Sequence, residues 1–415
     1  MKDNKIPSPL VSLLPVFVLI LLLFVTIRTF GSDALSGGSQ VCLLVATAVC
    51  VLTGMAGFHR PWKDFELAIT NNIAGVSTAL IILLIIGALS GAWMVSGVVP
   101  TLIYYGIQVI HPHFFLVSTC IICAVVSVMT GSSWTTIATI GIALMGIGKA
   151  QGFSEGWIAG AIISGAYFGD KVSPLSDTTI LASSVTDTPL FTHIRYLMIT
   201  TVPSLVITLI IFTIAGLSHE ATDTGHIAEY TRILSDKFHI SWWLMIVPVV
   251  TAILIARKVP SIITLFVSTA LATVFALIFQ PGLLCEIAGQ GAEGIAALFK
   301  GGMGMLYGGT QLETGNAEIN ELISTRGMAG MMNTIWLIIC AMCFGGAMTA
   351  GGMLGSITSV FVRFTKKRVG MVSSTVASGL FLNLATADQY ISIILTGNMF
   401  KDIYRANGYE SQLLS

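Results

Sequence analysis

Residues 73–110 read IAGVSTALIILLIIGALSGAWMVSGVVPTLIYYGIQVI, a run without one charged side chain. They lie inside a longer interval, between Glu66 and Lys149, that contains no Lys, Arg, Asp or Glu. A soluble domain needs charged residues on its surface, so an uncharged interval of about eighty residues predicts several packed membrane segments. The stretch therefore predicts an all-α polytopic membrane protein.

The composition of the whole chain agrees with a lipid environment. Of the 415 residues, 54% are hydrophobic and 10% are charged, against about a quarter charged in a typical soluble domain. The 20 Lys and Arg balance the 20 Asp and Glu, and no block of like charge marks a surface for nucleic acid. Most of the surface is therefore expected to face lipid, and nucleic acid is not expected as a partner.

Apolar segments recur along the chain at a length that suits a bilayer. The first, residues 6–27, follows Lys2 and Lys5 and lacks a small-residue cleavage site, so we interpret it as a membrane helix and not as a removed signal. Further segments of about 20 residues follow at 41–58, 73–110, 114–130, 191–217, 242–256, 259–279 and 331–361. They predict about 10–12 transmembrane segments when broken helices are counted.

Two pairs of segments resemble each other at nearly the same spacing. GALSGAWMVSGVVPTLI (87–103) resembles AMCFGGAMTAGGMLGSI (341–357) at an offset of 254. TGSSWTTIATIG (130–141) resembles TADQYISIILTG (386–397) at an offset of 256. Two matches at nearly one spacing predict an internal repeat. The first pair of segments aligns Gly97 with Gly351.

The ends of the two copies differ in charge. The first copy ends at the uncharged HPH of residues 111–113 and the second at the basic RFTKKR of residues 363–368, so the two ends are expected on opposite membrane faces. Inverted-topology repeats with broken or re-entrant helices are typical of secondary transporters. The chain then divides into four parts. Residues 1–72 form N-terminal transmembrane helices, and residues 73–190 form a first structural repeat with the ion-site segment. Residues 191–330 form connecting helices with polar loops, and residues 331–415 form a second structural repeat.

The second repeat is expected to be incomplete at its C-terminus. Adding the offset to residues 157–184 of the first copy gives about 413–440, beyond Ser415. The ending ESQLLS does not resemble a membrane anchor or a terminal helix. These observations favour a truncated chain, and the alternative is an asymmetric protein that is complete at Ser415.

The segment GAYFGDKVSPLSDTTILASS, residues 165–184, is the strongest candidate for an ion site. It places carboxylates, a lysine and hydroxyls around Pro174, which breaks a helix and frees backbone carbonyls toward a cavity inside the membrane. Na+ is a hard cation that accepts carboxylate, hydroxyl and carbonyl oxygens as ligands. A solvated loop with capping side chains is the competing interpretation. The candidate residues are Asp170, Lys171, Ser173, Ser176, Asp177 and Thr178.

Polar residues also mark a matching place in each repeat. The stretch TGSSWTT, residues 130–136, suits a half-helix N-terminus or a re-entrant tip, with helix packing as the alternative. In the second repeat, Asp388 is the only acidic residue between Glu321 and Asp402, and a lone carboxylate inside a membrane is a functional candidate. The further candidates for ion binding or proton coupling are Thr130, Ser132, Ser133, Thr136, Asn383, Thr386, Asp388 and Gln389.

Three aspartates, Asp170, Asp177 and Asp388, are the expected Na+ ligands. Desolvation in a partly dry cavity disfavours a charged carboxylate, so a proton can replace Na+ at the same site. Lys171 is either a counter-charge that leaves when the ion arrives or a residue that snorkels to the interface. The Gly-rich segment 301–316 is expected to be an extracellular loop, with a mobile gate as the alternative.

Three motifs carry a family resemblance: FGDKVSPLSDTT (168–179), TGSSWTT (130–136) and TADQYISIILTGNMF (386–400). Through them the sequence resembles the NhaC-type family of Na+/H+ antiporters, within the ion-transporter superfamily. The resemblance covers nearly the whole chain. It implies exchange of Na+ or Li+ for H+ by alternating access across the bacterial plasma (inner) membrane, a role in pH homeostasis, and no cofactor. It also implies a second polar, Pro-containing segment beyond residue 415.

Other functions compete with Na+/H+ exchange. An antiporter that couples Na+ and H+ to an organic acid, such as malate and lactate, needs a cationic or amide anchor, for which Lys171, Asn383 and Gln389 are candidates. A passive channel would not need coupling through a titratable carboxylate. The sequence is compatible with a homodimer but does not predict one.

An enzyme is not expected, because the sequence lacks the motifs of a catalytic or metal centre. There is no HExxH motif, and every His lies near the end of an apolar segment. The seven cysteines include Cys-x-x-Cys pairs at 120–123 and 340–343, but these lack the His spacing of a zinc site. We expect the cysteines to pack helices and to form no disulfides.

Overall fold

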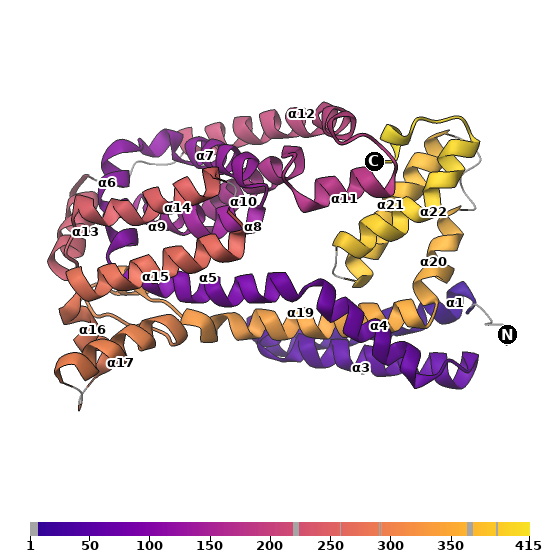
Figure 1. Cartoon of the computed structure of the whole chain (residues 1–415), viewed down its shortest axis with the longest axis horizontal. Helices are drawn as coiled ribbons and strands as arrows, with labels where there is room; N and C mark the ends of the chain where they lie inside the picture. Colours follow the sequence, from indigo (N-terminus) through magenta and orange to yellow (C-terminus); the bar gives the residue numbers. More distant parts are fainter. Residues whose placement is uncertain are drawn as a thin grey trace. The chain divides into compact units, whose positions relative to one another are not determined.

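The computed structural model describes residues 7–218, 224–257, 259–289, 291, 293–362, 368–386 and 389–415. Within these residues the regular structure is helical, from α1 to α22 (Figure 1), and a single bridge between extended segments joins Thr310 to Thr325. The all-α class is confirmed. The chain forms two compact units, which are described separately. Unit 1 comprises Met1–Leu80, Leu181–His193 and Met332–Ser415, and unit 2 comprises Ile81–Ile180 and Ile194–Met331.

Unit 2 contains most of α5 (Ser77–Val95) and then α6 (Val98–Val109), α7 (Phe115–Thr130), α8 (Ser133–Thr136), α9 (Ile142–Ala150) and α10 (Glu155–Val172). Helices α7 and α10 pack backbone against backbone. A Cβ atom at Gly165 would lie 2.1 Å from the carbonyl oxygen of Cys120, and one at Gly169 would lie 2.5 Å from that of Ala124. This GxxxG pair lets two helices approach closely in lipid. The packing fixes Asp170, which follows Gly169, against the end of α7.

The other helices of unit 2 are most of α12 (Leu190–Leu217), α13 (Thr224–Lys237), α14 (Ile246–Ala256), α15 (Ser261–Phe279), α16 (Pro281–Ala288), α17 (Gly294–Tyr307) and α18 (Ala317–Ile323). Figure 1 shows α16 and α17 as a short hairpin, in which a Cβ at Gly301 would lie 2.0 Å from the carbonyl oxygen of Leu284. The predicted loop at 301–316 is therefore wrong in its first half. Residues 301–307 belong to α17, because their glycines allow this close helix contact.

Unit 1 contains α1 (Pro9–Ser12), α2 (Leu14–Phe30), α3 (Gly38–Leu52), α4 (Trp62–Gly75) and most of α19 (Gly327–Ala350), followed by α20 (Met353–Val362), α21 (Arg368–Thr386) and α22 (Gln389–Ala406). Phe65 of α4 is fully buried and fills the space beside Gly54, where a Cβ would lie 2.5 Å from the ring. Helices α21 and α22 lie side by side. The last residues of α11 (Asp177–Val185) also belong to this unit.

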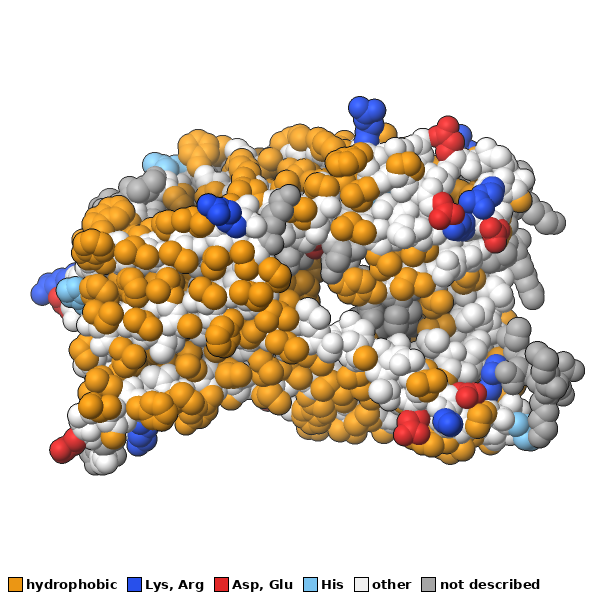
Figure 2. Space-filling view, in the orientation of Figure 1, with side chains coloured by type: hydrophobic (Ala, Val, Ile, Leu, Met, Phe, Trp, Pro, Cys, Tyr) orange, Lys and Arg blue, Asp and Glu red, His pale blue; other side chains and the backbone are white. Residues whose placement is uncertain are grey.

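Apolar residues cover much of the surface, as a protein surrounded by lipid requires. Among the described residues, seven helices are long and apolar enough to cross a membrane, or up to eight if the bent pair at 231–237 and 242–256 forms one span. Figure 2 shows hydrophobic side chains over most of the visible face and few charged ones. The protein is thus a multi-pass membrane protein. The expected number of 10–12 segments, which counts broken helices, stays a prediction.

The two resembling segments, 87–103 and 341–357, each contain a left-handed glycine between two helices. Helix α5 is followed by Gly97 at φ 85° and then α6, and helix α19 is followed by Gly352 at φ 70° and then α20. These two glycines are 255 residues apart, whereas the sequence alignment pairs Gly97 with Gly351. Helices α7 and α21 end at Thr130 and Thr386, an offset of 256. The internal repeat and the opposite orientation of its two copies stay predictions.

Candidate functional site

Two interruptions of helical structure meet in unit 2. The first lies between α7 and α8, where Gly131 has a φ of 67° and ends α7. The second lies between α10 and α11, at residues 173–176. A Cβ atom at Gly131 would lie 2.7 Å from the carbonyl carbon of Leu175 and 2.8 Å from its oxygen. Only glycine fits this position, both for its backbone conformation and for the contact. The two breaks therefore form one site.

Asp170 lies at this meeting point, near the end of α10. Its Oδ2 atom accepts a 2.9 Å hydrogen bond from the hydroxyl of Ser133, which is 3% exposed. Its Oδ1 atom is buried and has no hydrogen-bond partner among the described residues. A buried carboxylate oxygen without a partner is unfavourable, because the lost water contacts are not replaced. A cation or a proton at Oδ1 would supply the missing interaction.

Hydroxyl groups surround the first break. The Ser132 side chain caps α8 by accepting 3.2 Å hydrogen bonds from the backbone N–H and the hydroxyl of Thr135. The Thr136 hydroxyl donates to the Ser132 carbonyl at 3.0 Å. The Thr130 hydroxyl lies 3.1 Å from the same carbonyl and 3.4 Å from the Thr136 hydroxyl. A π-helical turn, Ile137–Gly141, follows directly, and such turns are frequent at functional sites. The predicted residues Thr130, Ser132, Ser133 and Thr136 are thus brought together.

The second break is ordered by its own side chains. The Ser173 hydroxyl donates to the Val128 carbonyl of α7 at 2.8 Å and accepts from the backbone N–H of Leu175 at 3.2 Å. Ser176 and Thr178 share a 3.0 Å hydroxyl contact. Pro174, between them, cannot donate to a helix carbonyl, which explains where α10 stops. The break is joined to Asp170 through Ser173, whose backbone N–H donates to the Asp170 carbonyl at 3.4 Å.

Thr179 is a residue of this site that the sequence prediction left out. Its hydroxyl donates to the carbonyl of Lys171 at 3.1 Å and lies 3.4 Å from the carbonyl of Asp170. The bond ties the first turn of α11 to the end of α10. The run of hydroxyls at 176–179 was a usable signal, but the partner carbonyls could not be known before the break was located.

The other predicted residues are not joined to this cluster by the structure. The Lys171 side chain is exposed, and so are Asn383 on α21 and Gln389 on α22. Asp177 begins α11, but its side chain, like that of Thr386, lies outside the described residues, and Asp388 does so entirely. The part of the chain that the structure describes contains no group of three or more His, Cys, Asp or Glu that could hold a metal ion. Among the side chains that the structure describes at the two breaks, Asp170 supplies a carboxylate, and hydroxyls and backbone carbonyls supply the other oxygens.

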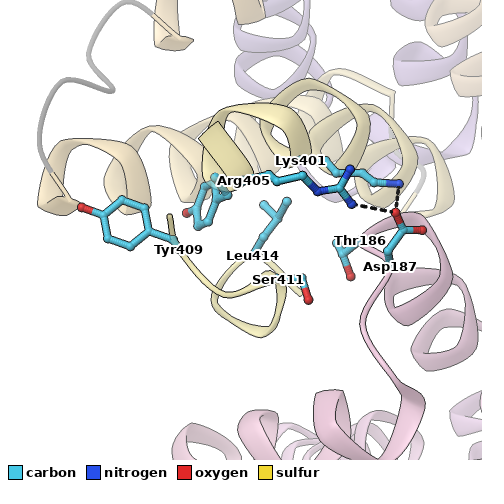
Figure 3. Close-up of a pocket in the computed structure, with 8 residues that line it drawn as sticks. Thr186, Asp187, Lys401, Arg405, Tyr409, Ser411 and Leu414 are labelled. Carbon is cyan, nitrogen blue, oxygen red and sulfur yellow. Dashed lines mark hydrogen bonds and ion pairs between the residues drawn. The ribbon is translucent and has the colours of Figure 1, made fainter. Parts of the chain in front are cut away.

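A second polar cluster, in unit 1, was not predicted at all. Asp187, in the turn between α11 and α12, accepts charged hydrogen bonds from Lys401 and from Arg405 on α22, the latter at 3.2 Å (Figure 3). The bond from Lys401, reinforced by Arg405, holds the pKa of Asp187 below its ordinary value. A pocket of about 220 Å³ lies beside these three side chains. Sequence alone gave no signal, because Asp187 and Arg405 are 218 residues apart.

The fold and the paired helix breaks define a multi-pass membrane protein with a carboxylate–hydroxyl site at interrupted helices, which is the architecture of a secondary transporter. Comparison with known proteins identifies the family. The model of the Na+/H+ antiporter family matches residues 165–415. This chain belongs to the Na+/H+ antiporter family, a family of transporters.

Named relatives within the family differ in what they carry. The chain is 34% identical to the malate-2H(+)/Na(+)-lactate antiporter of Bacillus subtilis, over 100% of this chain and 85% of that protein. It is 36% identical to the Na(+)/H(+) antiporter NhaC of Alkalihalophilus pseudofirmus, over 88% of this chain and 75% of that protein. It is also 32% identical to the arginine/ornithine antiporter ArcD of Halobacterium salinarum, over 96% of this chain and 79% of that protein.

Proposed function

We propose that this protein exchanges Na+, and also Li+, for H+ across the bacterial inner membrane, and that Asp170 carries the exchange. The observation that supports this most directly is the buried Oδ1 atom of Asp170, which has no hydrogen-bond partner among the residues that the structure describes, while Oδ2 accepts a hydrogen bond from Ser133. Either Na+ or a proton at Oδ1 would supply the interaction that this oxygen lacks. The two ions therefore compete for one carboxylate, and no cofactor is required.

The surrounding oxygens suit Na+ better than a transition metal. A hard cation without directional bonding accepts hydroxyl and backbone carbonyl oxygens beside one carboxylate. The break at residues 173–176 and the hydroxyls of residues 130–136 offer both kinds. We assign Asp170 as the ion and proton ligand and Ser133 as its positioning donor. We also retain the other predicted ligands as candidates. At the second break these are Ser173, Ser176, Asp177 and Thr178, and in the predicted second repeat they are Asn383, Thr386, Asp388 and Gln389.

In a transporter that works by alternating access, the same competition couples the Na+ flux to the H+ flux. With Na+ bound or with a proton bound, the carboxylate is neutralised and can move through the membrane interior at low cost, whereas the bare charge is expensive there. A return without either ion is therefore disfavoured, which couples the two fluxes. This coupling distinguishes the proposed antiport from a passive channel.

A second candidate is exchange coupled to an organic acid. It is favoured by one observation, the 34% identity over the whole chain to a protein named malate-2H(+)/Na(+)-lactate antiporter. A carboxylate substrate requires a cationic or amide anchor. The candidate anchors Lys171, Asn383 and Gln389 are all exposed, so the described residues lend no support to a buried anchor among them. We therefore place Na+/H+ exchange first.

The experiment uses everted membrane vesicles that contain the full chain and hold a respiration-driven proton gradient. Addition of NaCl alone is expected to dissipate the gradient, and addition of LiCl is expected to do the same. A response to sodium malate without a response to NaCl would move the assignment to organic-acid exchange. Loss of the NaCl response in Asp170→Asn, at unchanged protein level, links the flux to the site, and Asp236→Asn on the exposed face of α13 is the matched control.

A further inference from the structure

The pocket beside Asp187 lies wholly within unit 1. Thr186 and Asp187 directly follow α11, and the other lining residues belong to α22 and to the segment after it, up to Leu414 (Figure 3). One wall is the buried side chain of Tyr404, whose hydroxyl lies 3.1 Å from that of Thr375 on α21. The volume of about 220 Å³ has room for several water molecules or for one small ligand group.

Bases outnumber acids around this pocket. Lys401 and Arg405 lie one helical turn apart on α22, and both bind the same Oδ2 atom of Asp187. Among the described residues that line the pocket, Asp187 is the only acid, so one positive charge is left over. A third base is close by, because Arg368 lies over the ring of the lining residue Tyr409, 5.8 Å from its centroid.

The neighbouring acids do not balance this charge. Asp402 follows Lys401 directly, and consecutive residues of a helix point to different faces. Glu410 is exposed and accepts a hydrogen bond from Gln412. In the described part of the chain, the ion pairs of both bases on α22 end on Asp187. The pocket is therefore a basic one.

The donors in the pocket suit a tetrahedral oxyanion. An ammonium and a guanidinium each carry several N–H donors, yet Lys401 and Arg405 each reach Asp187 through a single nitrogen atom. Ser411 adds a hydroxyl to the lining, and the Arg405 side chain is 67% exposed, so a ligand from outside can reach it. A phosphate group offers several charged oxygens to such donors.

We propose that this pocket binds an anionic phosphate group through Lys401 and Arg405, and that the group competes with the Asp187 carboxylate for these two bases. The binding does not depend on which ion the protein exchanges.

Two sources supply such a group, the headgroup of an anionic phospholipid and free inorganic phosphate. The pocket lies where α21 begins, at Arg368, and where α22 ends, beside Arg405 in its last turn. Arg368 is the last residue of the basic run 363–368, which the sequence predicts on the cytoplasmic side. Anionic headgroups are abundant in the cytoplasmic leaflet, and basic pockets on that side bind them.

The test follows binding through the midpoint of thermal unfolding of the purified full chain in detergent. A ligand that binds the folded state raises this midpoint as its concentration increases. Potassium phosphate is compared with potassium chloride at equal ionic strength, and phosphatidylglycerol in mixed micelles with zwitterionic phosphatidylcholine. A specific rise with phosphatidylglycerol but not with phosphate assigns the site to a lipid headgroup. A specific rise with phosphate assigns it to a free phosphate group, and no specific rise with either overturns the proposal.

Variants separate binding in the pocket from a general salt effect on stability. Lys401→Gln with Arg405→Gln should lose the specific rise, and Arg405→Gln alone, at an exposed side chain, should weaken it. Asp187→Asn keeps a residue that tolerates the φ of 52° and removes the competing carboxylate. Its half-saturating ligand concentration should therefore fall about two- to fivefold. Arg232→Gln, in the exposed pair with Asp236, is the matched control and should keep the full rise.

The sign of the Asp187→Asn effect decides between binding and a purely structural role. If the ion pairs only stabilise the fold, Asp187→Asn lowers the midpoint without ligand and binds phosphate no more tightly than the unmodified protein. That outcome would overturn the proposal, and so would a full rise in the double Gln variant. Absence of Na+-driven flux in the unmodified protein would overturn only the proposed function.

Discussion

The Ser133 hydroxyl donates to Oδ2 of Asp170 at 2.9 Å across 37 residues of sequence, while Oδ1 of the same carboxylate is buried and has no partner in the described part of the chain. One half of the carboxylate is thus fixed in place and the other is available for a ligand. The contact depends on the short α7–α10 distance at Gly165 and Gly169 and on the turn at Gly131. The site is a consequence of helix packing as much as of the polar residues themselves.

Neutralising Asp170 or Asp388, two of the three proposed carboxylates, should abolish exchange. Asp170→Asn and Asp388→Asn are each expected to remove Na+-dependent proton movement, because an amide can neither release a proton nor neutralise Na+. The measurement is proton efflux from everted vesicles after addition of NaCl, normalised to the amount of protein in the membrane. Full activity in one of the two variants would remove that residue from the mechanism.

Removing the donor to Asp170 should weaken Na+ binding without abolishing exchange. Ser133→Ala deletes a hydrogen bond to a charged group, which is worth about 1.5–3 kcal/mol, so the half-saturating Na+ concentration should rise roughly 10-fold or more. Ser218→Ala, at an exposed serine directly after α12 whose hydroxyl donates to the Ile214 carbonyl, serves as the control. Half-saturation that is equal in Ser133→Ala and the unmodified protein would show that this contact does not organise the site.

The meeting of the two breaks can be tested at its glycine. Gly131→Ala places a Cβ 2.7 Å from the Leu175 backbone and forces alanine into a φ of 67°, which costs about 1–2 kcal/mol in conformation alone. We expect a lower unfolding midpoint and loss of Na+-dependent exchange. Gly156→Ala is the control, because an added Cβ meets nothing within 4 Å there. If Gly131→Ala keeps full exchange, the two breaks do not need to touch.

The Asp187 ion pairs should act alike at all physiological pH values. Because Lys401 and Arg405 lower the pKa of Asp187, its contribution is fully present above the unfolded value of about 3.9 and is lost only as the pH falls through the lower, folded value. The difference in unfolding midpoint between Asp187→Asn and the unmodified protein should therefore be the same at about pH 6.5 and about pH 8.5. A difference that changes with pH would mean that another titrating group controls the cluster.

The sequence predicted the parts of this site that depend on local chemistry. The polar segment around Pro174 and the hydroxyls near Gly131 were recognisable because apolar helices surround them, and Asp170 was selected for that reason. The hydrogen bond from Ser133 was not predictable, because it depends on the distance between α7 and α10. The GxxxG pair at Gly165 and Gly169 is the sequence feature that could have indicated this distance.

Long-range pairing explains the rest of what the sequence did not reveal. Asp187 follows a short turn and looks like a capping residue, since nothing nearby in the sequence carries a complementary charge. Its partners Lys401 and Arg405 become visible only when α22 is placed beside the end of α11. The internal repeat stays a prediction; the structure adds that the left-handed glycines Gly97 and Gly352 are 255 residues apart.

The most direct test of the central claim, that Na+ and H+ compete for Asp170, is the pH dependence of Na+ affinity. Initial rates of Na+-driven proton movement are measured in proteoliposomes over a series of Na+ concentrations at several pH values. If one carboxylate binds either ion, half-saturating Na+ rises as pH falls, by up to about tenfold per pH unit, while the maximal rate at saturating Na+ changes little. A half-saturating concentration that is independent of pH would contradict the shared site.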